Sequence, residues 1–340
     1  PEDVAELEAA EVWTLFDAER LDAAEARARE VLGRRGVERL PALTLVPLRA
    51  ALRRGDRAAL RAWFADTAAK LPVETAAEGW RLVAERFRAV PSDAGYAELL
   101  DAALARNPDD AAATFWRADL ALLRRRDAEA LALFRRYRAL RPDEGLARAT
   151  VAFAEARNGL LADAEASLEA ATASNAPPDA IVGALRELVG AHHAAKRYAD
   201  AARLQRRVAE RTQTPPDALD LGVLLLDAGD PNAAAEAYRA TLARDDLDRP
   251  TRAKAWNSLG LLHRGRGEAA DAERCLRASI AAWEDALDGR ENLGVLLVDL
   301  GRGAEAREHF EACLARDPER KRSLYYLLRL LRPETDGAGG

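Results

Sequence analysis

The sequence predicts an all-α protein in which short helices are stacked in pairs along the chain, forming an α-solenoid. Three recurring features predict it: a small alanine, a Leu-Gly pair before it, and a glycine turn between the two. The alanines stand at positions 130, 164, 201, 234, 272 and 306, so the steps are 34, 37, 33, 38 and 34 residues. A self-similar period of this length indicates a repeat architecture.

One repeat, residues 255–280, shows why each feature recurs. Its first helix carries an apolar stripe at i, i+3, i+4 and i+7, at Trp256, Leu259, Gly260 and His263. Its second helix carries a matching stripe at Ala272, Leu276, Ser279 and Ile280. Gly267 lies between the two helices, where a tight turn often needs a positive φ. Gly260 and Ala272 are small, which lets the helices approach closely.

This pattern, with Trp256, Leu259, Gly260 and His263 followed by Ala272, Leu276 and Ser279, resembles the tetratricopeptide repeat family. The same signature recurs at Trp80, Val83, Ala84 and Phe87 with Pro108, and at Ala306, Phe310 and Cys313 with Pro318. The resemblance implies a right-handed superhelix whose first helices line a concave groove and whose second helices form the outer wall. Three residues depart from the pattern of apolar and small packing positions, namely Tyr96, Arg117 and Gln205.

We expect about nine helix pairs and one further helix. The pairs fall near residues 2–36, 37–73, 74–108, 109–142, 143–177, 178–213, 214–249, 250–284 and 285–318. The predicted division of the chain is a divergent N-terminal part (1–73), the main repeat array (74–318), a C-terminal capping helix (319–332) and a disordered tail (333–340).

Composition excludes several classes of function. The chain is 49% hydrophobic and 32% charged, as a folded protein with a core should be. Its net charge of −6 argues against nucleic acid as the main partner, although a local basic patch stays possible. With two cysteines and no apolar run or leader, we expect a cytoplasmic protein with no membrane span. The excess of arginine over lysine suggests a bacterial, GC-rich genome.

The sequence offers no recognisable catalytic or cofactor motif, so we expect neither an enzyme nor a cofactor. The Gly-x-Gly segments lie in predicted helix-helix turns and not after a strand. The four histidines and two cysteines are expected to pack in the core or lie on the surface, without a metal or a disulfide. They are His192, His193, His263, His309, Cys275 and Cys313.

The family resemblance places specific first-helix positions in the groove. In the last two pairs these candidates are Lys254, Asn257, Leu261, Arg264, Asp288, Glu291, Val295 and Asp299, preceded by Leu219, Val223, Leu226 and Asp227. We expect this mixed polar and apolar groove to hold an extended or helical peptide; the alternative is a solvated, empty groove. The carboxylate clamp of chaperone-tail binders and the asparagine ladder of the sugar-transferring relatives are both absent.

Two further segments are candidate interaction surfaces. The first is arginine-rich and could attract an acidic partner or form a solvated outer wall, with Arg124, Arg125, Arg126, Arg135, Arg136, Arg138 and Arg141. The second is the last helix, which is apolar on more than one face. Its candidates for contact with a second copy or another protein are Tyr325, Tyr326, Leu328 and Leu331, although the tyrosines could instead close the groove end.

Together these features favour a non-catalytic scaffold or adaptor that binds a partner protein or peptide, because a solenoid presents an extended surface for contact. Two alternatives stay open at this point. The chain could be a regulatory or targeting part of a larger enzyme system whose catalytic part is elsewhere, or it could be a self-assembling oligomeric scaffold.

Overall fold

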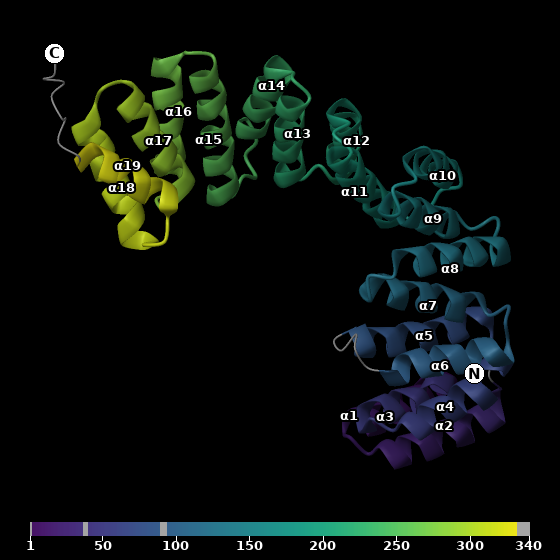
Figure 1. Ribbon diagram of the computed structural model, residues 1–340. Helices are drawn as coiled ribbons and strands as arrows, with labels where there is room; N and C mark the ends of the chain where they lie inside the picture. Colours follow the sequence, from purple (N-terminus) through teal and green to yellow (C-terminus); the bar gives the residue numbers. More distant parts are fainter. Residues whose placement is uncertain (1, 37–39, 89–93, 332–340) are drawn as a thin grey trace, which may run out of the picture. The chain divides into compact units, whose positions relative to one another are not determined.

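The computed structural model describes residues 2–36, 40–88 and 94–331, and within these ranges all regular structure is helical. Figure 1 shows the helices following one another as antiparallel pairs along the chain. The chain divides into two compact units, residues 1–181 and 182–340, which are described separately. The predicted disordered tail at 333–340 lies outside the described residues.

The described residues of the first unit form five helix pairs. Their bounds are α1 (Glu2–Asp17), α2 (Leu21–Arg35), α3 (Val46–Arg54), α4 (Arg57–Asp66), α5 (Val73–Arg88), α6 (Ala94–Arg106), α7 (Ala111–Leu123), α8 (Asp127–Leu140), α9 (Gly145–Arg157) and α10 (Leu161–Ala173). Two short 3₁₀ helices, η1 (Pro41–Leu45) and η2 (Ala68–Lys70), flank the α3–α4 pair. Most of α11 (Pro178–Ala194) belongs to the second unit.

The second unit continues the same arrangement. After α11 come α12 (Tyr198–Thr212), α13 (Pro215–Asp227), α14 (Pro231–Leu242), α15 (Arg249–Gly265), α16 (Ala269–Ala282), α17 (Leu287–Asp299), α18 (Gly303–Arg316) and α19 (Lys321–Leu331). Within the described residues, the prediction of about nine helix pairs followed by one more helix is therefore confirmed. The division of the chain into four segments stays a prediction.

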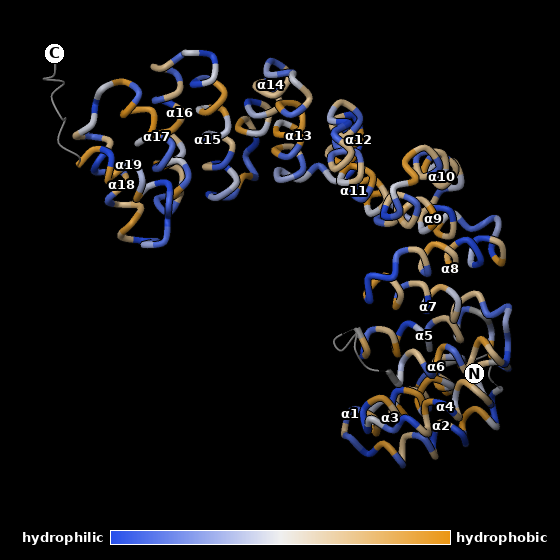
Figure 2. Tube along the Cα trace, viewed as in Figure 1, coloured by the Kyte–Doolittle hydropathy of each residue, from blue (hydrophilic) through white to orange (hydrophobic). Residues whose placement is uncertain are grey.

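The core is spread along the stack. Figure 2 shows apolar residues in every helix pair of each unit, and the buried residues form several clusters, each shared by consecutive helices. In the second unit, for example, one cluster joins α16, α17 and α18 through Leu276, Leu293 and Phe310. Such nearest-neighbour burial is what keeps a solenoid folded, because one helix pair cannot cover both of its faces.

The recurring glycines explain how closely the paired helices pack. A Cβ atom added to Gly260 would lie 2.8 Å from Cγ of Leu276, and one on Gly294 would lie 2.8 Å from the Phe310 ring. The turn glycine Gly267 has a φ of 77°, as predicted. At the corresponding turns of three other pairs, Glu19, Arg125 and Lys196 adopt positive φ values of 58°, 58° and 59° without being glycine.

Polar and aromatic interactions account for the three residues that depart from the repeat pattern. Tyr96 is buried and stacks on Phe87, with ring centroids 5.2 Å apart. Gln205 is buried and its Nε2 donates a hydrogen bond to the backbone oxygen of Asp217 at 3.0 Å. Arg117 forms ion pairs of 2.7 Å with Asp101 and with Glu129, which bridges three helices.

Candidate functional site

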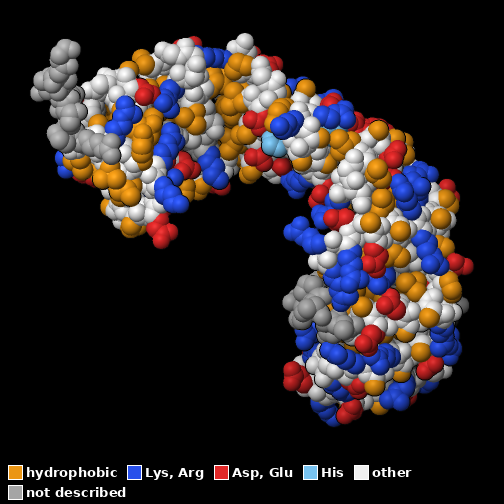
Figure 3. Space-filling view, viewed as in Figure 1, with side chains coloured by type: hydrophobic (Ala, Val, Ile, Leu, Met, Phe, Trp, Pro, Cys, Tyr) orange, Lys and Arg blue, Asp and Glu red, His pale blue; other side chains and the backbone are white. Residues whose placement is uncertain are grey.

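From α13 onward, the first helices of the second unit form one continuous face, because each contacts the next first helix directly. Contacts join α13 to α15, α15 to α17, and α17 to α19, in addition to those within the pairs. Helix α19 therefore occupies the place of a further first helix. On the face of this unit that Figure 3 displays, hydrophobic side chains lie between charged ones over α13 to α17.

Two apolar side chains on this face are open to solvent. Val223 of α13 is 43% exposed, and Leu261 of α15 is 38% exposed. They occupy equivalent groove positions in neighbouring repeats. Lys254, seven residues before Leu261 on α15, is also exposed and has no carboxylate within ion-pair distance among the described residues.

Polar candidates on α15 and α17 are paired with one another across the two helices. Arg264 donates to Asp299 at 2.6 Å, an ion pair with both partners partly exposed. Asn292 donates through Nδ2 to Asn257 Oδ1 at 2.9 Å, and its own oxygen accepts from Arg322. These links fix the spacing of the two helices, and they engage three of the predicted groove residues, namely Asn257, Arg264 and Asp299.

The remaining candidates on α17 lie against α19. Val295 is fully buried, so this predicted contact position is not on the accessible surface. Glu291 is also buried, and its Oε1 accepts a 2.6 Å hydrogen bond from Ser323 of α19. Asp288 forms an ion pair with Arg320. The expectation that Glu291 and Val295 face a partner is wrong, because both pack within this chain.

Helix α19 has one packed side and one exposed side. Tyr326 stacks on Phe310 with ring centroids 5.4 Å apart and an interplanar angle of 8°, and Leu330 packs against the same cluster. On the other side, Tyr325, Leu328 and Leu331 are 60%, 56% and 51% exposed. Of the four predicted surface residues, Tyr326 therefore serves internal packing, and the other three are accessible.

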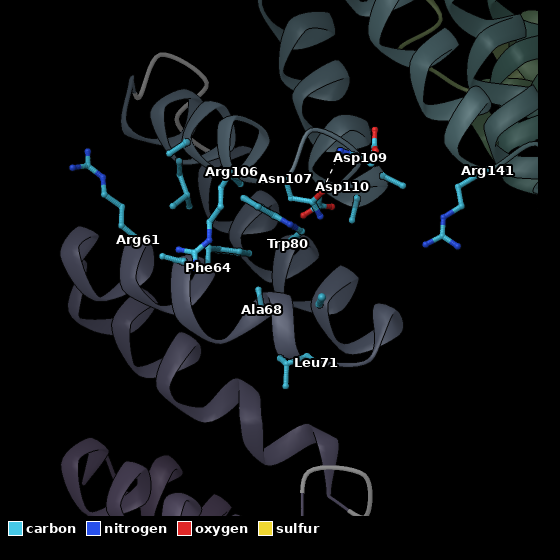
Figure 4. Close-up of a pocket in the computed structure, with 17 residues that line it drawn as sticks. Arg61, Phe64, Ala68, Leu71, Trp80, Arg106, Asn107, Asp109, Asp110 and Arg141 are labelled. Atoms are coloured by element: carbon cyan, nitrogen blue, oxygen red, sulfur yellow. Dashed lines mark hydrogen bonds between the residues drawn. The ribbon is translucent and has the colours of Figure 1, made fainter.

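A pocket that the sequence did not indicate lies in the first unit. It has a volume of about 530 Å³ and is lined from α4, α5, α6 and the start of α7. Phe64 and Trp80 stack at its floor, with centroids 3.7 Å apart. Figure 4 shows Arg106 reaching toward Phe64, while Arg61 and Arg141 lie at opposite sides. Such a pocket can take an apolar group, with Arg106 as a donor beside it.

Most polar atoms around this pocket have structural roles. Arg61 forms an ion pair with Glu98 at 2.6 Å. Asp110 caps α7, because its Oδ1 accepts the backbone N–H of Ala113 at 2.9 Å. Sequence reasoning recognised Trp80 only as a repeat position, and nothing in the pattern of a single repeat places it beside Phe64 of the preceding one.

Three titratable groups at the α15–α16 turn could hold a metal ion. Ligand atoms of His263, Glu268 and Asp271 lie within 4.8 Å of one another. His263 is buried, as its packing position predicts, and Nδ1 hydrogen-bonds to Glu268. Asp271 forms an ion pair with Arg274 at 2.6 Å. The contacts within this group thus also serve to join the two helices of one repeat.

The cysteines and His309 are buried or half-buried groups. Cys275 and Cys313 are free thiols in the core, and burial raises the pKa of each. The pKa of His309 is lowered, first by partial burial and then by the nearby charges of Arg290 and Arg277. A thiol with a raised pKa is a poor nucleophile at neutral pH, so these cysteines fit a packing role.

The geometry defines the class of this protein: it is an α-solenoid of stacked helix pairs, a scaffold suited to protein–protein interaction. The sequence model of the tetratricopeptide repeat matches residues 97–145, 219–286, 259–321 and 291–332. The chain therefore carries tetratricopeptide repeats over these residues, and the recognition of this repeat from the sequence pattern is confirmed.

Among solved structures, the chain is similar to one in the crystal structure of the APC/C hetero-tetramer Cut9-Hcn1, with 15% identity and a TM-score of 0.40. That match covers 96% of this chain and 56% of the other, so this chain spans a little over half of its length. No curated protein matches the chain. Within the described ranges, no helix combines the length and apolarity needed to cross a membrane.

Proposed function

We propose that the chain is a non-catalytic scaffold that captures an extended or helical segment of a partner protein along α13, α15 and α17. The observation that carries this proposal is the exposure of Val223 and Leu261 at equivalent positions of neighbouring first helices. Apolar side chains repeated on adjacent helices offer a strip on which the apolar side chains of a bound segment can be buried.

The charges beside this strip favour an acidic flank on the bound segment. Lys254 is an exposed cation without an ion-pair partner among the described residues, whereas Arg264 is already paired with Asp299. A carboxylate of the partner would therefore be attracted mainly to Lys254.

The test is selection of binding peptides from a random library displayed on phage, using the full chain, followed by affinity measurement. Leu261→Glu should weaken the selected peptides at least about tenfold, because it places a charge in the apolar strip. Leu160→Glu is a matched control, since Leu160 is also 38% exposed but lies at the start of α10. Equal loss in both variants would show that the strip is not the binding surface.

A charge reversal tests the acidic flank separately. Lys254→Glu should weaken capture of acidic peptides and leave neutral ones unchanged. Purification from the native host followed by mass spectrometry would then name the partner, and would separate a free-standing adaptor from a regulatory part of a larger enzyme system.

A second candidate function, self-association through α19, is supported by the exposed stripe of Tyr325, Leu328 and Leu331. Light scattering should give a higher mass for the full chain than for one ending at Pro318. Because that truncation also removes packing on Phe310, Leu328→Glu provides a milder test. An unchanged mass in both variants would reject self-association through this helix.

We further infer a cytoplasmic location in a bacterial cell, without nucleic acid or membrane as a partner. Two buried free thiols suit a reducing compartment, and a net charge of −6 disfavours phosphate backbones. The bacterial origin rests on the arginine-rich, lysine-poor composition alone.

A further inference from the structure

A second cavity in the first unit is lined by arginines. It has a volume of about 580 Å³ and lies among α8, α9 and α10. Arg135 and Arg138 reach it from α8, and Arg148 reaches it from α9. The rest of the lining is Ala139, Pro142, Ala166, Ser167 and Ala170, with no carboxylate. The small side chains let a ligand approach the helices closely.

The hydrogen bonds of these arginines leave positive charge uncompensated. Arg148 donates to Ser174 Oγ and, at 2.8 Å, to the backbone oxygen of Pro142, and both acceptors are uncharged. The side chain of Arg138 is exposed and forms no hydrogen bond or ion pair with any residue of the described ranges. Two of the three guanidinium groups therefore have no carboxylate partner.

The third arginine is held in position by a buried acid. Arg135 pairs with Glu155 Oε1 at 3.0 Å, while Glu155 Oε2 accepts from Ser167 at 2.7 Å. Glu155 is only 3% exposed, so it lies behind the cavity wall and not in it. This arrangement orients the Arg135 guanidinium and leaves some of its N–H groups for a ligand.

The site combines a feature of the sequence with one that only the fold reveals. Arg135 and Arg138 are three residues apart in the arginine-rich segment, so they share one face of α8. Arg148 lies outside that segment and is brought to the same cavity because α8 packs against α9. Other arginines of the segment are engaged elsewhere: Arg126 pairs with Glu129, and Arg136 donates to the Pro108 oxygen.

We propose that this cavity binds a phosphate monoester on a side chain of a partner protein segment. A phosphate monoester carries a charge of about −1.5 to −2 at neutral pH, which matches the two uncompensated guanidinium charges. It also offers three terminal oxygens to donors that converge from separate positions, whereas one carboxylate is satisfied by a single bidentate arginine. The alanine-lined wall leaves room for the residues that flank the phosphorylated side chain.

The test measures fluorescence anisotropy of labelled Gly/Ala peptides with a central phosphoserine, serine or glutamate, using the full chain at fixed ionic strength. The phosphopeptide should bind at least about tenfold more tightly than the other two, and inorganic phosphate should compete with it. Arg138→Gln should weaken phosphopeptide binding about tenfold or more. It should not lower the free energy of unfolding, because the Arg138 side chain makes no hydrogen bond within the described residues.

Two control variants make the outcome specific. Arg125→Gln removes the same charge from an exposed arginine that does not line the cavity, and it should change the affinity less than about twofold. Leu261→Glu should leave phosphopeptide binding unchanged, because Leu261 belongs to the second unit and the cavity belongs to the first. The two variants Arg138→Gln and Leu261→Glu therefore test the arginine-lined cavity and the apolar strip of the second unit independently of each other.

Each of the following results would overturn the proposal. The serine or glutamate peptide could bind as tightly as the phosphopeptide, or Arg125→Gln could weaken binding as much as Arg138→Gln. No binding of the phosphopeptide at about 1 mM would also reject it. Binding of inorganic phosphate without binding of the phosphopeptide would show that the cavity takes small anions and not a partner segment.

Discussion

Arg186 of α11 donates two hydrogen bonds to the carboxylate of Asp217 on α13, at 2.9 Å and 3.1 Å. The hydroxyls of Thr212 and Thr214 donate to the same carboxylate at 2.7 Å each. Desolvation alone would raise the pKa of Asp217, but these hydrogen bonds outweigh it and hold the pKa below its ordinary value. One nearly buried carboxylate thus joins the ends of two repeats.

The first prediction is a loss of stability in acid that depends on Asp217. Since the pKa of Asp217 is lower in the folded chain, its ionised form stabilises the fold above the unfolded pKa, near 3.8, and this contribution is lost as the pH falls below it. Asp217→Asn should lower the free energy of unfolding by about 1–3 kcal/mol at pH 7. Urea unfolding at pH 7 and at pH 3 measures the free energy of unfolding of wild type and variant; a difference between them that is as large at pH 3 as at pH 7 contradicts the prediction.

The second prediction concerns the close contact of paired helices. Gly260→Ala should lower the free energy of unfolding by about 1–3 kcal/mol, because the new methyl group would collide with Leu276. Gly190→Ala is the matched control, since a Cβ there meets nothing within 4 Å in the interior of α11. That control should gain about 0.5–1 kcal/mol from helix propensity. Thermal unfolding of the two variants should therefore shift in opposite directions.

The third prediction tests what anchors α19. Glu291→Ala should destabilise the C-terminal end of the second unit by about 1–3 kcal/mol, because it leaves the buried Ser323 hydroxyl without its acceptor. Hydrogen exchange should show faster exchange of the α19 amides and unchanged exchange in α13. Uniformly faster exchange across the unit would mean that α19 unfolds only together with its neighbours.

The fourth prediction is low reactivity of both cysteines. Because burial raises the pKa of Cys275 and of Cys313, little thiolate is present at pH 8 and neither sulfur is accessible. Modification by a coloured disulfide reagent should be slow in the native chain and complete within seconds in guanidinium chloride. Fast reaction of one thiol under native conditions would identify a local opening at that repeat.

The repeat period predicted the helix pairs because local rules dominate a solenoid. Gly260, Leu276 and Gly267 lie within one repeat, so their spacing alone specifies where the two helices of the pair cross and where the chain turns between them. The assignment of Val295 and Glu291 to an open groove was wrong for a different reason. Their exposure depends on whether another helix follows the last pair. Helix α19 does follow it and packs on α17 in the way that the first helix of a further repeat would, so both side chains are buried.

The two cavities were equally inaccessible to sequence reasoning. The arginine-rich segment was recognised, but its meaning depends on which arginines are already paired and on Arg148, which α9 contributes. The aromatic pocket likewise needs Phe64 and Trp80 from successive repeats to stack. A pattern describes one repeat at a time, whereas both cavities are formed where neighbouring repeats of the first unit meet.

The positive φ of Glu19, Arg125 and Lys196, at turns where other repeats place glycine, has a mechanical consequence. A left-handed backbone conformation costs a residue with a side chain about 1 kcal/mol relative to glycine, so at these three turns the paired helices should separate most easily under tension. If the chain is stretched by its ends, the two helices of a pair should separate first at α1–α2, α7–α8 and α11–α12, and optical tweezers would record those steps at the lowest force.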